Sequence, residues 1–353
     1  MLSLEQLQLL VHLKQYIVAD KETCSLFADE YALRPLIRYK YISHHNGIYR
    51  LLKKGKGVTG HIEPLMSDSG NADKIERTLK TSRLAATFAN MRYRSTGVLR
   101  DNSFIPSNKW KEIRRGITST AKFNGILTYG KTRLAVYDIG DGEMEWQTFA
   151  EGSLFFQKYT TNETLMTGML WICDGDELDI AERILRYTLS NRTKTMKRSK
   201  LETDKKWAYS FSPICLKPNY ESVYITNRSG IAETLRLAAN EKTFLNCFAE
   251  TLQGATANFN SCDVEAYPTR YFINPQGDLL KFATAYDKVK SMIKHNKKVT
   301  NPVYAVPDLK YHIITSKKYE RLAKLYDLPL GYTVVDDNLI EEIMEDGTNN
   351  EEY

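Results

Sequence analysis

The start of the chain shows apolar residues at helical spacing. Ser3 and Gln6 have the spacing of a capping box, in which each side chain bonds the backbone amide of the other residue. Leucine and valine recur every three or four positions after them, which predicts a helix over residues 4–16. Asp20 can cap a second, shorter helix that reaches about Phe27. The pattern therefore indicates two helices of unequal length.

A third helix is predicted from about Asp29 to Lys40, because apolar positions again recur at helical spacing. Pro35 lies inside this segment, where it would kink the helix or mark its first turn. The side chains that this helix offers to a core are Tyr31, Leu33, Leu36 and Ile37.

Two strand patterns follow, at residues 41–43 and 48–52, with Asn46 and Gly47 between them. Asn-Gly is a strong hairpin signal, because both central positions of a type I′ turn have positive φ. Three short helices and a hairpin are typical of a winged helix-turn-helix, whose third helix enters the major groove while its wing contacts phosphates. The neighbouring His44 and His45 have no third metal ligand at suitable spacing.

The distribution of charge indicates what these elements bind. The protein has a net charge of +6, and between Arg34 and Gly60 it has seven basic residues and no acidic one. A basic run over a recognition helix and wing indicates double-stranded DNA as the partner. A solvated basic face without a ligand and a winged helix that binds protein are the alternatives. The residues expected to bind DNA are Arg34, Arg38, Lys40, Arg50, Lys53, Lys54 and Lys56.

The segments Tyr31–Ile42 and Ile48–Gly55 resemble the recognition helix and wing of replication-relaxation-type proteins from plasmids and conjugative elements of Gram-positive bacteria. The similarity extends into residues 123–151. This resemblance implies a C-terminal domain of restriction-endonuclease-like character. It also implies a role in replication, mobilisation or transcription control of a mobile element, with a relaxase or a replication initiator as a partner.

The chain is predicted to have four regions: a winged helix (1–60), a long helix (71–95), a body (117–335) and an acidic tail (336–353). Asn71 can cap the long helix, whose apolar stripe would pack against a second copy in a homodimer or against the chain's own C-terminal domain. Residues 96–116 are rich in basic, Gly, Asn and Ser residues, which indicates a basic connector that contains the domain boundary.

From Phe123 onward, strand patterns alternate with helical patterns, so the body is predicted to be α/β and the whole chain α+β. A strand, turn and helix succession occurs twice, which indicates a duplicated unit. Residues 191–206 are basic and have little to bury, and they are predicted to form an exposed loop. The expected strands are 125–129, 133–139, 144–149, 171–173, 223–225 and 331–335, and the expected helices are 154–159, 177–189, 231–239, 279–293 and 319–326.

One group of carboxylates imitates nuclease chemistry. Asp138 ends a predicted strand, and Glu145 with Gln147 follows on the next, which is close to the pattern of a Mg²⁺-dependent restriction-type nuclease without its usual lysine. Asp176 lies in an acidic run that lacks the ligands of a calcium loop, so it is expected to cap the following helix. Nucleotide-binding, zinc-protease and esterase motifs are absent from the sequence. We therefore assign no catalytic residue, metal ligand or cofactor.

The remaining composition indicates a cytoplasmic protein. The five cysteines are widely spaced without a CxxC pair, which is typical of reduced thiols, and no apolar stretch approaches the ~20 residues of a membrane span. Residues 336–353 contain eight acids, no base and a short apolar patch, and are predicted to be a solubilising end or a phosphate mimic. The sequence thus predicts a non-catalytic DNA-binding protein, with a Mg²⁺-dependent nuclease and a protein-binding adaptor as alternatives.

Overall fold

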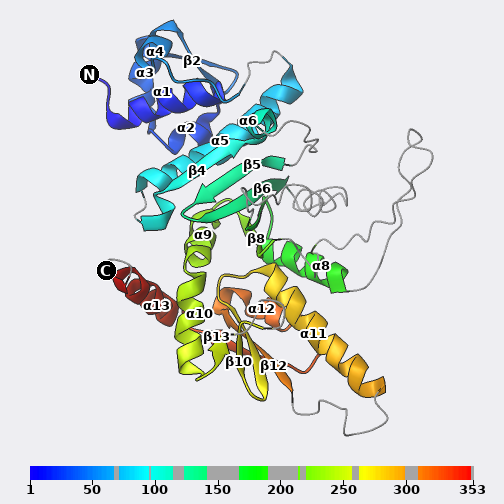
Figure 1. Cartoon of the computed structure of the whole chain (residues 1–353). Coiled ribbons are helices and arrows are strands. Elements are labelled where there is room, and N and C mark those ends of the chain that lie inside the picture. The colour runs from blue at the N-terminus through cyan, green and yellow to red at the C-terminus, as the bar shows by residue number, and fades with distance from the viewer. Residues whose placement is uncertain are drawn as a thin grey trace, which may run out of the picture. The chain divides into compact units, whose positions relative to one another are not determined.

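The computed structural model describes residues 1–66, 71–94, 97–113, 123–140, 167–189, 214, 220–256, 262–298 and 309–350. It has mixed helical and β structure with several sheets (Figure 1), which confirms the predicted class at this level. The chain divides into two compact units, Met1–Arg133 and Leu134–Tyr353. Within the described ranges, no helix is long and apolar enough to cross a membrane.

The first unit begins with three helices and a small antiparallel sheet of order β1-β3-β2. The predicted helices and hairpin are confirmed, whereas β1 and α4 were not predicted. Two residues are too few for a strand pattern, and the two glycines of α4 disfavour a helix. The elements are α1 (Leu4–Tyr16), β1 (Val18–Ala19), α2 (Lys21–Ser25), α3 (Glu30–Arg38), β2 (Ile42–His45), β3 (Ile48–Leu51) and α4 (Lys53–Val58).

Side-chain caps begin the three N-terminal helices. The Ser3 hydroxyl accepts a hydrogen bond from the Gln6 amide at 3.2 Å, and the Gln6 side-chain oxygen accepts one from the Ser3 amide at 3.0 Å. Asp20 caps α2 and Asp29 caps α3, each accepting a backbone N–H bond of 2.8 Å. These bonds confirm the predicted caps at Ser3 and Asp20, whereas the cap at Asp29 was not predicted. Each satisfies a backbone donor that has no partner inside its helix.

The long helix α5 (Ala72–Arg94) was predicted, but its packing was not. Its buried side contacts α1, α2 and β1 of the first unit. The Ser82 hydroxyl donates to the Val18 carbonyl at 2.7 Å, and Arg83 forms ion pairs with Asp20 and Glu22. The N-terminal helices therefore pack against the buried side of α5.

The prediction of a basic connector over residues 96–116 is wrong for 97–113. This stretch contains η1 (Gly97–Leu99), β4 (Asn102–Pro106) and α6 (Ser107–Ile113), and β4 pairs antiparallel with β5 (Phe123–Tyr129). The buried Asn102 amide donates to the Phe88 and Leu99 carbonyls at 3.0 and 2.7 Å. Asn102, a residue type that is typical of loops, thus bonds the backbone of the preceding segment.

The second unit begins within β6 (Thr132–Gly140), which runs parallel to β7 (Gly168–Cys173), and β7 runs parallel to β8 (Ser222–Asn227). The predicted strand, turn and helix units are confirmed as β7 with α8 (Glu177–Leu189) and β8 with α9 (Ile231–Ala239). The helix α10 (Glu241–Thr251) was not predicted. The expected elements at 144–149 and 154–159 and the expected loop at 191–206 lie outside the described residues.

A second sheet has the order β13-β12-β11-β10-β9, with parallel pairing among β11, β12 and β13. Only its last strand was predicted. The helix expected over 319–326 is instead a 3₁₀ turn and one turn of α-helix. The elements are β9 (Ala255–Thr256), β10 (Val264–Ala266), β11 (Thr269–Asn274), α11 (Leu279–Lys298), β12 (Lys310–Ser316), η3 (Lys317–Tyr319), α12 (Glu320–Ala323), β13 (Leu330–Val335) and α13 (Asp337–Asn350).

Residues Asp337–Asn350 of the C-terminal acidic segment form the helix α13. Ile340, Ile343 and Met344 are buried and belong to one apolar cluster with Phe244 and Val335. Arg236 also makes two hydrogen bonds of 2.6 Å to Glu341. The expectation of a freely solvated end is therefore wrong for this segment, because its apolar patch belongs to the core of the second unit.

Candidate nucleic-acid interface

The helix α3 presents one face to the core and one to solvent. Leu33 and Leu36 are buried, whereas Tyr31 is 79% exposed and Ile37 is 37% exposed. The prediction that Tyr31 and Ile37 belong to the core is therefore wrong, since two leucines three positions apart set the buried face of this nine-residue helix. Arg34 and Arg38 are both exposed, and helical spacing places them with Tyr31 on the side opposite the leucines.

The exposed arginines of α3 have only weak partners. The Arg34 guanidinium lies 3.0 Å from a Glu30 oxygen and 5.6 Å from the centre of the Tyr31 ring. The bond from Arg34 lowers the pKa of Glu30. Arg38 lies 5.8 Å from the centre of the Tyr39 ring. Exposed pairs of this kind contribute little free energy, so both guanidinium groups can exchange these partners for an anionic ligand.

The backbone after α3 turns sharply into the hairpin. Lys40 has φ 59°, and the Tyr41 amide donates to the Leu36 carbonyl at 2.9 Å, while the Lys40 amide donates to Ile37 at 3.0 Å. These bonds close the helix through a residue in the left-handed region. They leave the Lys40 side chain exposed between α3 and β2.

The hairpin confirms the predicted turn. Asn46 and Gly47 have φ values of 49° and 76°, and His45 pairs with Ile48 across the two-residue loop. The His44 ring stacks on the Tyr49 ring with centroids 4.3 Å apart. In the part of the chain that the structure describes, no three side chains are placed to hold a metal ion.

The helix α4 carries a lysine over two tyrosine rings. The Lys54 ammonium lies 4.3 Å from the centre of the Tyr41 ring and 5.8 Å from that of Tyr39. With Arg38, these residues form what we call the basic aromatic cluster: Arg38, Tyr39, Tyr41 and Lys54. The cluster connects the end of α3 to α4, and its tyrosines were not predicted as site residues.

The structure thus brings together only some of the predicted DNA-binding residues. Arg38 and Lys54 share the basic aromatic cluster, and Arg34 lies one turn earlier on α3. Lys53 and Lys56 are exposed on α4, and Arg50 is half-buried in β3 opposite Ser43 and Val18. The interleaving of basic residues with Tyr31, Tyr39 and Tyr41 was the sequence signal for the aromatic part of this surface.

Gly55 allows α4 to lie against the base of the hairpin. A Cβ atom at this position would be 2.4 Å from the Tyr41 carbonyl oxygen and 2.7 Å from a methyl group of Leu51. We expect Gly55→Ala to lower the free energy of unfolding by ~1–3 kcal/mol, as overpacking does elsewhere. Gly57→Ala in the same helix is the control, because a Cβ there has no neighbour within 4 Å. Urea unfolding measures both, and equal stability of the two variants would contradict the close approach.

Arg228 pairs with two carboxylates of the second unit. Asp138 lies 2.9 Å from Arg228, whose guanidinium also lies 2.9 Å from Asp174. Asp138 additionally accepts a hydrogen bond from the Gly140 amide. Asp176 caps α8 as predicted, accepting the Leu178 amide bond at 2.8 Å. Glu145 and Gln147, which would complete the nuclease-like group, lie outside the described residues.

Glu177, the first residue of α8, bonds residues from two other parts of the second unit. Its side chain is mostly buried and lies 3.1 Å from the Lys318 ammonium, and it accepts a 2.6 Å hydrogen bond from Asn227. The carboxyl ends of β6, β7 and β8 are therefore connected by matched acidic and basic groups. Such pairing positions loops, and it occupies the oxygens that a Mg²⁺ ion would need.

Comparisons with known proteins add nothing to this picture. No family model, curated protein or solved structure matches the chain. We therefore infer function from the contacts of the first unit.

Proposed function

We propose that residues 1–60 form a winged helix-turn-helix that binds double-stranded DNA without catalysis. The element order α1-β1-α2-α3-β2-β3 and the sheet order β1-β3-β2 are those expected of this motif. The short strand β1 supports the proposal, because it supplies the third strand from the link between the first two helices. In this arrangement α3 is the recognition helix and the β2–β3 hairpin is the wing.

The outward face of α3 is the observation that carries the proposal. Arg34 and Arg38 are exposed there beside Tyr31, and the chain from Arg34 to Gly60 has no acidic residue to repel phosphates. Arginine reads guanine through two hydrogen bonds in the major groove, whereas a contact to a phosphate, from either basic residue, positions the protein without reading sequence. We therefore assign base contacts to α3 and phosphate contacts to Lys40 and the α4 lysines.

The proposed setting is replication, mobilisation or transcription control of a mobile element. The resemblance of α3 and the hairpin to replication-relaxation-type proteins supports it, and implies a relaxase or replication initiator as partner and a restriction-endonuclease-like body. The ion pair between Asp138 and Arg228 supports a body without nuclease chemistry. Mg²⁺-dependent DNA cleavage that is lost in Asp138→Ala would favour the nuclease alternative. Failure to bind any duplex at low salt would favour the protein-binding adaptor.

The salt dependence of binding tests the phosphate contacts. We expect Lys54→Ala to weaken binding to all duplexes alike and to reduce the slope of log K against log salt by about one, because one fewer counterion is released. Fluorescence anisotropy of labelled duplexes across a salt series measures the slope. Lys74→Ala, at an exposed position on α5, is the control and is expected to keep the original slope. An unchanged slope in Lys54→Ala would remove this lysine from the interface.

A further inference from the structure

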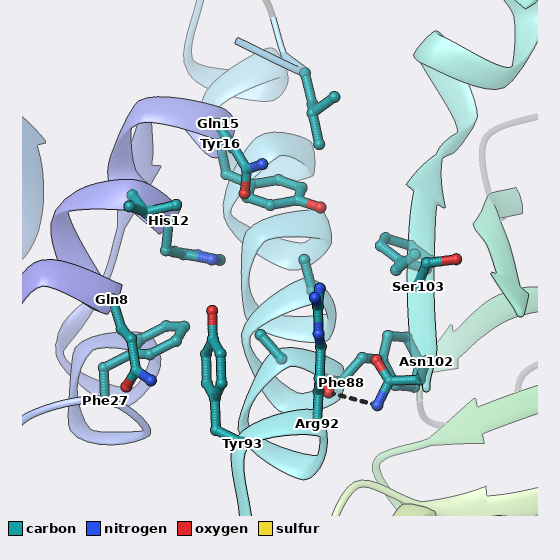
Figure 2. Close-up of a pocket in the computed structure, with 15 residues that line it drawn as sticks. Gln8, His12, Gln15, Tyr16, Phe27, Phe88, Arg92, Tyr93, Asn102 and Ser103 are labelled. Atoms are coloured by element: carbon teal, nitrogen blue, oxygen red, sulfur yellow. Dashed lines mark hydrogen bonds between the residues drawn. The ribbon is translucent and has the colours of Figure 1, made fainter. Parts of the chain in front are cut away.

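The first unit contains a cavity of about 230 Å³ between α1, α5 and β4 (Figure 2). Six of its fifteen lining residues have ring side chains. The His12 ring stacks on Tyr16 with centroids 4.8 Å apart and lies 4.9 Å from the Phe27 ring. Phe88 and Phe104, from α5 and β4, form a second ring pair with centroids 5.2 Å apart. A flat ring system is the shape that such walls accept.

His12 supplies an open hydrogen-bond acceptor. Its Nε2 lies 2.9 Å from the Ser82 hydroxyl, which donates its own proton to the Val18 carbonyl at 2.7 Å. Nε2 is therefore the protonated nitrogen, and Nδ1 keeps a lone pair. Nδ1 bonds none of the residues that the structure describes, although the side chain is only 3% exposed. Figure 2 shows the imidazole directed into the opening, with the Tyr93 hydroxyl pointing toward it.

Arg92 supplies a positive charge at the same opening. It lines the cavity from α5, across from His12 in Figure 2. In the described part of the first unit, no acidic side chain pairs with it. The side-chain amides of Gln8 and Gln15 also line the cavity. An acceptor on a buried imidazole, an exposed arginine and several ring side chains together form a set of contacts that apolar packing does not require.

We propose that this cavity binds a small planar aromatic carboxylate that carries an N–H or O–H donor. The carboxylate pairs with Arg92, the ring lies between the aromatic walls, and the donor bonds Nδ1 of His12. The cavity is smaller than the ~300–1,000 Å³ typical of drug-sized ligands, which favours one ring or two fused rings. Arginine suits this role because its planar guanidinium binds a carboxylate through two parallel hydrogen bonds.

The cavity adjoins the turn that begins the recognition helix. Phe27 follows α2 by two residues, and its neighbour Ala28 donates to the Cys24 carbonyl immediately before the Asp29 cap of α3. A ring held against His12 and Phe27 therefore contacts the segment that orients α3. This part of the inference depends on the proposed DNA-binding function, and we expect the bound acid to change duplex affinity.

Calorimetry of the full chain with 2-aminobenzoate tests the cavity without DNA. We expect 2-aminobenzoate to bind. Benzoate lacks the donor, cyclohexanecarboxylate lacks the planar ring, and 2-aminobenzamide lacks the negative charge, so each is expected to bind at least about tenfold more weakly. Arg92→Gln is expected to weaken 2-aminobenzoate binding by about tenfold or more. Arg94→Gln, on the same helix but outside the lining, is expected to leave it unchanged.

Two results would overturn the cavity assignment: no binding of any probe at millimolar concentration, or equal 2-aminobenzoate affinity in Arg92→Gln and Arg94→Gln. Duplex binding is then measured with and without saturating 2-aminobenzoate. An unchanged duplex affinity would overturn the regulatory part alone. A chain that binds 2-aminobenzoate but no duplex would overturn the proposed function and leave the ligand site standing, so the two failures are distinguishable.

Discussion

Replacing Arg34 or Arg38 with alanine is expected to weaken binding to the preferred duplex by ~1–3 kcal/mol each. Both guanidinium groups are exposed on the outward face of α3, where two parallel hydrogen bonds to a guanine edge are possible. The loss should fall on particular base positions, because a phosphate contact would weaken all sequences alike. Selection from a random duplex pool, followed by titration of the selected duplex and single-base variants, measures both effects.

Two further variants sharpen this test. Arg77→Ala removes an exposed arginine from α5 and is expected to bind every duplex as the unaltered protein does. Glu30→Gln removes the carboxylate that pairs with Arg34 at 3.0 Å, so it should raise duplex affinity, and more strongly at low salt, where screening is weakest. If Arg34→Ala and Arg38→Ala both keep full affinity and sequence preference, α3 does not read DNA.

The sequence predicted those parts of the first unit whose causes lie within a few residues. A capping box needs only Ser3 and Gln6, and a type I′ turn needs only Asn46 and Gly47. The strand β1 depends instead on pairing between Val18 and Arg50, which are distant in the sequence. The helix α4 likewise depends on Gly55 fitting against Tyr41. Contacts of this kind leave no local pattern.

The candidate site shows the same division between local and distant causes. The basic run identified Arg34 and Arg38, but the outward direction of Tyr31 depends on which side of α3 the two leucines bury. In the second unit, Asp138 lies near the end of a strand, where its sequence context resembles that of a metal ligand, but its ion-pair partner Arg228 lies 90 positions along the chain. The sequence around Ile340 resembles an acidic tail, because the apolar residues that pack against Ile340 come from α10 and β13 and not from its own segment.

Opposite responses to acid are expected of the two units. Burial lowers the pKa of His12 from 6.5 to about 3, so the folded first unit holds this imidazole neutral. Between pH 3 and 6.5 the His12 imidazole is therefore protonated in the unfolded chain and neutral in the folded one. The contribution of His12 is therefore fully present above pH 6.5 and is lost as pH falls toward 3, by on the order of 5 kcal/mol.

Asp278 acts in the opposite direction in the second unit. Burial raises the pKa of Asp278 from 3.8 to about 7. The hydrogen bond that its carboxylate accepts from the Val223 amide opposes this rise, as does Lys281, whereas Glu241 adds to it. Between these values the folded state binds the additional proton. The stability from Asp278 is thus present below pH 3.8 and is lost as pH rises through 7, by on the order of 4 kcal/mol.

Hydrogen exchange of the full chain, read separately for peptides of each unit between pH 4 and 8 after correction for intrinsic rates, measures these slopes. Asp278→Asn keeps the Oδ1 acceptor for the Val223 and Leu280 amides, so it should flatten the slope of the second unit, while Asp327→Asn, at an exposed position, should not. His12→Gln should flatten the slope of the first unit alone. Each substitution removes one titrating group and leaves the other unit intact. If stability changes with pH in the same direction in both units, or if the Asp278→Asn protein keeps the original slope, these two buried side chains do not have opposite proton linkage.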